Sequence, residues 1–266
     1  MKLLKNLQNE LDFFLRSRIK FSKKYKGENE AKEGLFNHFP EQKRKTAKEK
    51  EKLYLKKYRL ENLKNNSTQL NYLENLVTIE LLEKYLKVDK QKPAVLDIGS
   101  KNWFYAKGEY NFFRYNNFEK EIRLDGIEID AFRIYLDLCT RYDYAVYYTQ
   151  GLENCRYLPK NLLNHRKKYD YITWFFPFLT EYPLLKWGLP LSVFKPVEML
   201  EHAVSLLNPD GQLLIVNQDE NEYSIQEQLI QNQNLNYIKA GVFNNSFLDY
   251  EHKRYVTLIH IEKGNF

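Results

Sequence analysis

The chain contains little cysteine. Cys139 and Cys155 are the only two cysteines among its 266 residues, and neither lies at a short spacing from other metal-ligating side chains. This pattern does not indicate a zinc site, and two unpaired thiols are typical of a protein kept in a reducing compartment. We therefore expect free thiols and no metal centre.

The sequence also lacks a long apolar run. The longest, from Ile172 to Leu179, is far shorter than the roughly 20 residues that cross a bilayer. Lys2 and Lys5 interrupt the first apolar residues, so the apolar segment of a signal peptide is missing. We expect a cytoplasmic protein with no transmembrane segment.

Aromatic side chains, by contrast, are abundant. The chain has 21 Tyr and 17 Phe, with 43% hydrophobic and 29% charged residues, a composition typical of a globular protein. A length of 266 residues is compatible with one or two domains.

Positive charge is concentrated at the N-terminus. Residues 1–60 hold 18 Lys and Arg against 8 Asp and Glu, although the whole chain carries only +6. One explanation of this excess of positive charge is a lysine-rich helix surface that faces solvent. The alternative is an anionic partner at these basic N-terminal helices, such as nucleic acid, an acidic protein or a membrane surface.

Three segments before residue 90 have helical periodicity. An apolar stripe at helical spacing marks the first; its members are Leu3, Leu4, Leu7, Leu11, Phe14, Leu15 and Ile19. Residues 41–64 are dense in Lys and Glu three or four apart, and residues 70–85 show a third apolar pattern. We expect residues 1–90 to form a helical cap that packs on a sheet.

From Pro93 onward the pattern alternates between strand and helix. Ala94–Ile98 is a short apolar run followed by Gly99, and a second run begins at Leu124 and ends in the carboxylates of Glu128 and Asp130. Parallel strands with a glycine turn after the first and an acid after the second are typical of a nucleotide-binding α/β sheet.

The remaining segments complete this pattern. We expect helices at residues 102–115, 131–141, 197–207 and 224–233, and further strands at 144–148, 168–176, 212–216, 236–243 and 254–262. The fold class predicted for residues 91–266 is α/β, a Rossmann-like, seven-stranded, mostly parallel sheet with helices on both faces.

Two motifs resemble those of the class I S-adenosylmethionine-dependent methyltransferases. They are Val95-Leu96-Asp97-Ile98-Gly99 and Gly126-Ile127-Glu128-Ile129-Asp130, supported by the Leu207-Asn208-Pro209-Asp210-Gly211 turn before a strand. The family's GxGxG loop here reads Gly99-Ser100-Lys101-Asn102-Trp103, so two of its three glycines are replaced.

The resemblance implies S-adenosylmethionine as cofactor and a set of residues that bind it. Glu128 would accept hydrogen bonds from the ribose, Asp97 would lie near the methionine amino group, and the loop at residues 149–154 would flank adenine. The full implied set is Asp97, Gly99, Ser100, Asn102, Glu128, Ile129, Gln150, Leu152 and Trp174. No catalytic base is assigned.

Residues 180–196 form a proline-containing apolar insertion. Its large side chains would make a hydrophobic wall for an apolar acceptor, or would instead cover the cap; they are Tyr182, Leu184, Leu185, Trp187, Leu189 and Phe194.

We therefore expect a methyltransferase that acts on a small molecule or on RNA. The alternative is a Rossmann-like binding protein that has kept the fold and lost catalysis, because fold does not imply function. The sequence does not predict the oligomeric state.

Overall fold

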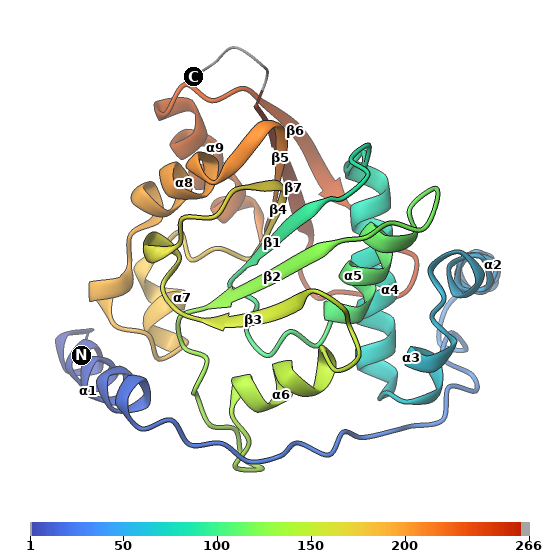
Figure 1. Ribbon diagram of the computed structural model, residues 1–266, viewed down its shortest axis with the longest axis horizontal. Coiled ribbons are helices and arrows are strands. Elements are labelled where there is room, and N and C mark those ends of the chain that lie inside the picture. Colours follow the sequence, from blue (N-terminus) through green and yellow to red (C-terminus); the bar gives the residue numbers. More distant parts are fainter. Residues whose placement is uncertain (1, 262–266) are drawn as a thin grey trace.

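The computed structural model describes residues 2–261 (Figure 1). Its centre is a seven-stranded sheet in the order β3-β2-β1-β4-β5-β7-β6. The strands are β1 (Ala94–Ile98), β2 (Arg123–Glu128), β3 (Cys155–Pro159), β4 (Tyr169–Phe175), β5 (Leu207–Asn217), β6 (Tyr237–Phe243) and β7 (Arg254–His260). All neighbours are parallel except that β7 runs antiparallel to β5 and to β6. The predicted fold class is confirmed.

Helices cover both faces of this sheet. The N-terminal helices are α1 (Lys2–Arg18), α2 (Glu41–Tyr58), α3 (Glu61–Asn65) and α4 (Gln69–Tyr85). The others are α5 (Ala106–Tyr115), α6 (Arg141–Tyr148), α7 (Glu181–Lys186), α8 (Pro196–Ser205) and α9 (Glu220–Asn232), with short 3₁₀ turns at η1 (Leu162–Asn164) and η2 (Leu191–Val193).

Two apolar cores lie on opposite faces of the sheet. One joins α2, α4 and α5 to the sheet through residues such as Leu76, Phe112 and Tyr171. The other joins α8 and α9 to it through residues such as Leu200 and Ile230. Helices α4 and α5 approach closely at Gly108, where a Cβ would lie only 2.7 Å from the backbone oxygen of Asn75. The lack of a side chain at Gly108 permits this approach.

The helices of the first 90 residues pack in two separate places. Figure 1 shows α1 beside α7 at one edge of the molecule, with α2, α3 and α4 on the other side and residues 19–40 running between them. The predicted N-terminal helices are present, and α2 and α4 pack on the sheet as expected, whereas α1 lies apart from them beside α7. The domain boundary at residue 90 stays a prediction.

The predicted packing of the apolar stripe of α1 was wrong. We expected it to pack on the sheet, whereas its leucines and Phe14 face outward and Asn9 is the one buried residue of the helix. Polar side chains, not the stripe, attach this helix to the rest of the molecule.

A second error concerns residues 131–148. The predicted helix at 131–141 is an irregular loop with a bridge between Ile134 and Thr140, and the predicted strand at 144–148 is helix α6. Thr140 and Asp143 form a capping box that starts α6, and this local signal outweighs the strand propensity of its tyrosines. The third strand is Cys155–Pro159 instead.

Other boundaries differ less. The helix expected at 41–64 is divided into α2 and α3 at Arg59, whose backbone is left-handed with φ of 52°. The helix expected from residue 102 begins at Ala106. The last residue of the strand predicted at 254–262, and the rest of the predicted domain to 266, lie outside the described residues.

Candidate cofactor and acceptor site

The loop after β1 keeps the backbone of a glycine-rich turn without its glycines. Gly99, Lys101 and Trp103 have φ angles of 72°, 54° and 49°, so all three adopt the left-handed conformation that glycine tolerates best. The backbone N–H groups of Gly99 and Ser100 donate to the Ile127 oxygen at 2.9 and 3.2 Å, which ties the loop to the end of β2. The two positions at which the motif's glycines are replaced therefore have the backbone conformation that glycine favours.

Trp103 does not fill the hollow beside this loop. Its indole is fully buried below the turn, where Nε1 donates to Glu109 at 3.2 Å. A Cβ on Gly126 would lie 2.7 Å from the indole ring, so β2 needs a glycine there for the ring to fit. Lys101, by contrast, lines the cavity, and its Nζ lies 4.8 Å from the centre of the Trp187 ring.

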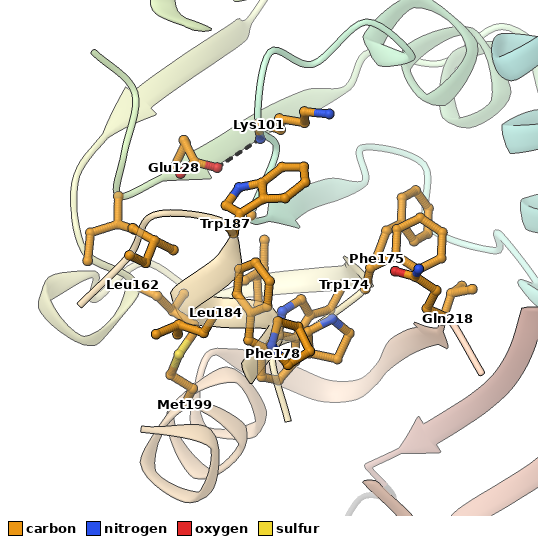
Figure 2. A pocket seen from close by; sticks show the side chains of 18 of the residues that line it. Lys101, Glu128, Leu162, Trp174, Phe175, Phe178, Leu184, Trp187, Met199 and Gln218 are labelled. Carbon is orange, nitrogen blue, oxygen red and sulfur yellow. Dashed lines mark hydrogen bonds between the residues drawn. The ribbon is translucent and has the colours of Figure 1, made fainter. Parts of the chain in front are cut away.

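Glu128 at the end of β2 is held in place by three donors. Its Oε2 accepts from the backbone N–H of Lys101 at 2.9 Å, and its Oε1 accepts from the backbone N–H of Asp130 at 2.8 Å and from Arg141 at 3.3 Å. A carboxylate offers about four acceptor positions, so one remains after these three contacts. Figure 2 shows the bond between Glu128 and Lys101 at the cavity wall.

Asp97 lies away from the cavity. Its side chain is fully buried and accepts hydrogen bonds from Tyr105 at 2.9 Å and Thr173 at 3.1 Å. Burial raises the pKa of Asp97 to about 7, and burial together with the charge of Asp97 raises the pKa of neighbouring Glu109. The structure does not bring Asp97 to the place where a direct contact with a methionine amino group would be made.

One cavity of about 790 Å³ opens at the carboxyl ends of the parallel strands. Four of the nine residues implied by the resemblance line it: Gly99, Glu128, Ile129 and Trp174. Buried Ser100 bonds to the Asp97 backbone oxygen at 3.1 Å, and half-buried Asn102 has a buried side-chain oxygen with no hydrogen-bond partner. Both lie in the loop without lining the cavity.

Gln150 and Leu152 lie elsewhere. They precede β3, so they sit at the amino end of the sheet, whereas the cavity opens at the carboxyl end. Their assignment next to adenine depended on a strand at 144–148, and because that segment is helical the loop following it cannot reach the cavity. Neither residue lines the cavity.

The apolar insertion covers this cavity. Figure 2 shows the indole of Trp187 between the Glu128–Lys101 hydrogen bond and the ring of Phe178, and the two rings are 6.2 Å apart. Arg141 also faces this indole, with its Cζ 5.6 Å from the ring centre. Of the two arrangements that the sequence left open for the insertion, lining the cavity is the one observed for all its large side chains except Leu185: Tyr182, Leu184, Trp187, Leu189 and Phe194.

A polar cluster lines another part of the cavity. The Tyr250 hydroxyl donates to Glu74 at 2.8 Å, and the Arg254 guanidinium lies 4.6 Å from the ring centres of both Tyr250 and Phe176. Burial raises the pKa of Glu74, which favours its proton-bearing form. No sequence pattern indicates this cluster, because Glu74 and Tyr250 are 176 residues apart and only the fold brings them together.

Neither metal binding nor membrane crossing is indicated. Within residues 2–261, no three His, Cys, Asp or Glu side chains are grouped as they would be around a metal ion. Over the same residues, every helix is too short or too polar to cross a bilayer.

No family model and no curated protein matches this chain in sequence. Solved structures do share its fold. An S-adenosylmethionine-dependent methyltransferase from Aquifex aeolicus superimposes with a TM-score of 0.50 and 15% identity, over 70% of this chain and 91% of that one. A Listeria monocytogenes protein assigned to the class I methyltransferases gives 0.52 and 12%, over 73% of this chain and 61% of that one. The chain therefore has the fold of the class I S-adenosylmethionine-dependent methyltransferases.

Proposed function

We propose that this protein is an S-adenosylmethionine-dependent methyltransferase whose cofactor lies against the loop after β1 and the end of β2. One observation carries the proposal: a left-handed turn at residues 99–103 and the Glu128 carboxylate meet at the wall of a single cavity. A volume of about 790 Å³ is within the range of small-molecule sites.

The residues present fit the nucleoside half of this cofactor. Nothing lies within 4 Å of a Cβ built on Gly99, so the turn leaves open space at the cavity wall. The free acceptor position of Glu128 suits a ribose hydroxyl, and a second hydroxyl would compete with Arg141 for the carboxylate. Gly99, Glu128, Ile129 and Trp174 are the residues that would hold the cofactor.

When bound, S-adenosylmethionine supplies a methyl group on a sulfonium centre. The protein's task is then to align the acceptor and to exclude water, since direct displacement depends on position more than on acid or base groups. Trp187 in the covering insertion and Phe178 just before it provide that exclusion.

The cavity favours a small acceptor with an apolar part over RNA. Its wall opposite Glu128 is built from Leu162, Leu184, Phe178 and Met199 (Figure 2). A polar group on the same acceptor would meet Glu74, Tyr250 and Arg254 at the other part of the cavity. Because burial raises its pKa, Glu74 is a stronger base than an exposed carboxylate, which suits it to accept a proton if the acceptor must lose one.

Calorimetric titration with S-adenosylhomocysteine tests cofactor binding. We expect the wild-type chain to bind and Glu128→Gln to bind at least about tenfold more weakly, because the amide loses the charge that strengthens a hydrogen bond to a hydroxyl. Glu153→Gln is the matched control, since this exposed carboxylate lies outside the cavity. No binding by the wild-type chain, or equal binding by Glu128→Gln, would contradict the proposal.

Catalysis needs a separate measurement. Incubation with S-adenosylmethionine labelled in its methyl group, together with either a small-molecule extract or total RNA, should label the small-molecule fraction. Label in RNA would point to the other acceptor class.

A second candidate function is cofactor binding without methyl transfer. It is favoured by the burial of Asp97 beneath Tyr105, which removes that carboxylate from the cavity. Binding of S-adenosylhomocysteine with no label in either fraction would support this candidate.

A further inference from the structure

Helix α1 turns its apolar side to solvent. The side chains of this stripe are between 43% and 73% exposed: Leu3, Leu4, Leu7, Leu11, Phe14, Leu15 and, just after the helix, Ile19. Exposed apolar patches of this extent on one helix side are unusual unless the helix has a partner.

The orientation of α1 is fixed by polar contacts on its other side. Asn9 donates to the backbone oxygens of Leu185 and Leu189 at 3.0 and 2.9 Å. Arg16 forms an ion pair with Asp130 at 2.8 Å and donates to the Gly188 oxygen at 3.1 Å. These bonds hold the apolar stripe outward, so its exposure is built into the fold.

A neighbouring loop extends the same apolar surface. The segment between β2 and α6 exposes Leu136 completely and Ile134 and Leu138 by about half. It lies next to the C-terminal end of α1, because Lys20 is 5.5 Å from the Phe132 ring centre and Lys23 donates to the Asp137 oxygen at 2.8 Å. We call α1 and residues 134–138 together the apolar surface.

Positive charge surrounds this apolar surface. Residues 2–26 contain eight Lys and Arg against two Asp and Glu, and seven of the basic residues are exposed; these are Lys2, Lys5, Arg18, Lys20, Lys23, Lys24 and Lys26. An apolar stripe bordered by basic residues is the pattern of helices that lie in the surface of an anionic bilayer.

We propose that the apolar surface binds the surface of an anionic lipid bilayer, with α1 lying in the interface. A second copy of the chain fits less well, because a symmetric pair would place these basic residues against each other. The proposal is that α1 lies in the bilayer surface and does not span it, because α1 has 17 residues and six of them are charged. This proposal does not depend on methyl transfer.

Vesicle flotation tests it on the full chain. We expect binding to phosphatidylcholine vesicles that contain about one third phosphatidylglycerol, weaker binding to pure phosphatidylcholine, and a loss of binding as salt is raised, because screening removes the attraction between basic residues and lipid headgroups.

The double variant Leu7→Gln/Leu11→Gln separates the apolar contribution. Binding should fall at least about tenfold, since two inserted leucines are replaced by polar side chains. Leu53→Gln/Leu70→Gln is a matched control on α2 and α4, because Leu53 is as exposed as Leu7 (56%) and Leu70 as exposed as Leu11 (60%). The control should float like the wild type, and both variants should keep the wild-type circular dichroism.

Two results would overturn the proposal. One is the absence of wild-type protein from the floated anionic vesicles at low salt. The other is a dimer by light scattering that Leu7→Gln/Leu11→Gln converts to monomer, which would identify a second copy as the partner.

Discussion

Helices α1 and α4 are both 17 residues long, and they relate to the molecule in opposite ways. Eleven residues of α4 are buried, including Leu76 and Ile79. In α1 only Asn9 is buried, and its leucines are exposed. Both sequences contain leucines at helical spacing, so periodicity alone did not distinguish them.

The comparison shows what each kind of contact contributes. Helix α4 is fixed by apolar burial against α5 and the sheet, and its polar residues reach the cavity only through Glu74 and Thr78. Helix α1 is fixed by directional hydrogen bonds and by two ion pairs, Lys2–Glu181 and Arg16–Asp130, and its apolar side remains exposed. The burial of α4 stabilises the fold, whereas the attachment of α1 leaves an apolar surface exposed to solvent.

The largest expected difference concerns one leucine in each helix. Leu76→Ala in α4 should lower the free energy of unfolding by about 3 kcal/mol, because it removes a fully buried side chain and leaves a cavity. Leu7→Ala in α1 should change it by less than about 0.5 kcal/mol, because Leu7 is largely exposed. Urea unfolding of both variants measures the two changes in the free energy of unfolding. Similar losses for Leu76→Ala and Leu7→Ala would contradict the contrast between the two helices.

A second difference depends on pH. The pKa of Asp97, on the α4 and α5 side of the sheet, is raised to about 7, above the value of about 3.9 in an unfolded chain. Between these two pKa values the folded state binds more protons than the unfolded state, so the free energy of unfolding should fall by roughly 3 kcal/mol as pH rises from about 4 to about 7. Asp97→Asn should flatten this decline in urea unfolding at several pH values. An unchanged slope would mean that another group is responsible.

The attachment of α1 predicts a smaller effect. Asn9→Ala removes two hydrogen bonds to backbone oxygens and should cost about 1 kcal/mol, mainly as local loosening of α1 and α7. Hydrogen exchange of peptides that cover residues 2–18 and 181–189 should become faster. Gln8→Ala, an exposed polar change on the same helix, is the control and should leave both peptides unchanged.

The smallest effect concerns the turn that leads from β1 to α5. Lys101→Gly should raise the free energy of unfolding by less than about 1 kcal/mol. Glycine removes the strain of a left-handed backbone at φ of 54°, but it also increases the conformational entropy of the unfolded chain, which offsets part of the gain. Lys107→Gly, in the regular part of α5, should instead lower it by about 1 kcal/mol. Effects of the same sign in thermal unfolding would show that residue 101 is not strained.

Much of the fold could be predicted from the residues. Short apolar runs at Ala94–Ile98 and Tyr169–Phe175 became central parallel strands, and the turn at residues 207–211 came before the long apolar part of β5. The error at residues 131–148 arose because tyrosine-rich sequence fits both a strand and a helix. The capping box at Thr140 and Asp143 was the signal that could have decided it.

The site could be predicted only in part. Gly99 and Glu128 were found because a turn and an acid follow two neighbouring strands. Arg141 and Glu74 were not assigned to the cofactor or acceptor site, because they come from segments whose positions depend on how the chain packs. No spacing in the sequence relates Glu74 to Tyr250.

By itself, the sequence determined six of the seven strands, the turn after β1 and the acid at the end of β2, because short-range apolar patterns and backbone preferences act within a few residues. Only the tertiary structure decided which side of α1 is buried, that Asp97 is sealed beneath Tyr105, and that Trp187 covers Glu128. Those outcomes depend on contacts between distant segments, where polar anchors such as Asn9 and Arg16 can outweigh an apolar stripe.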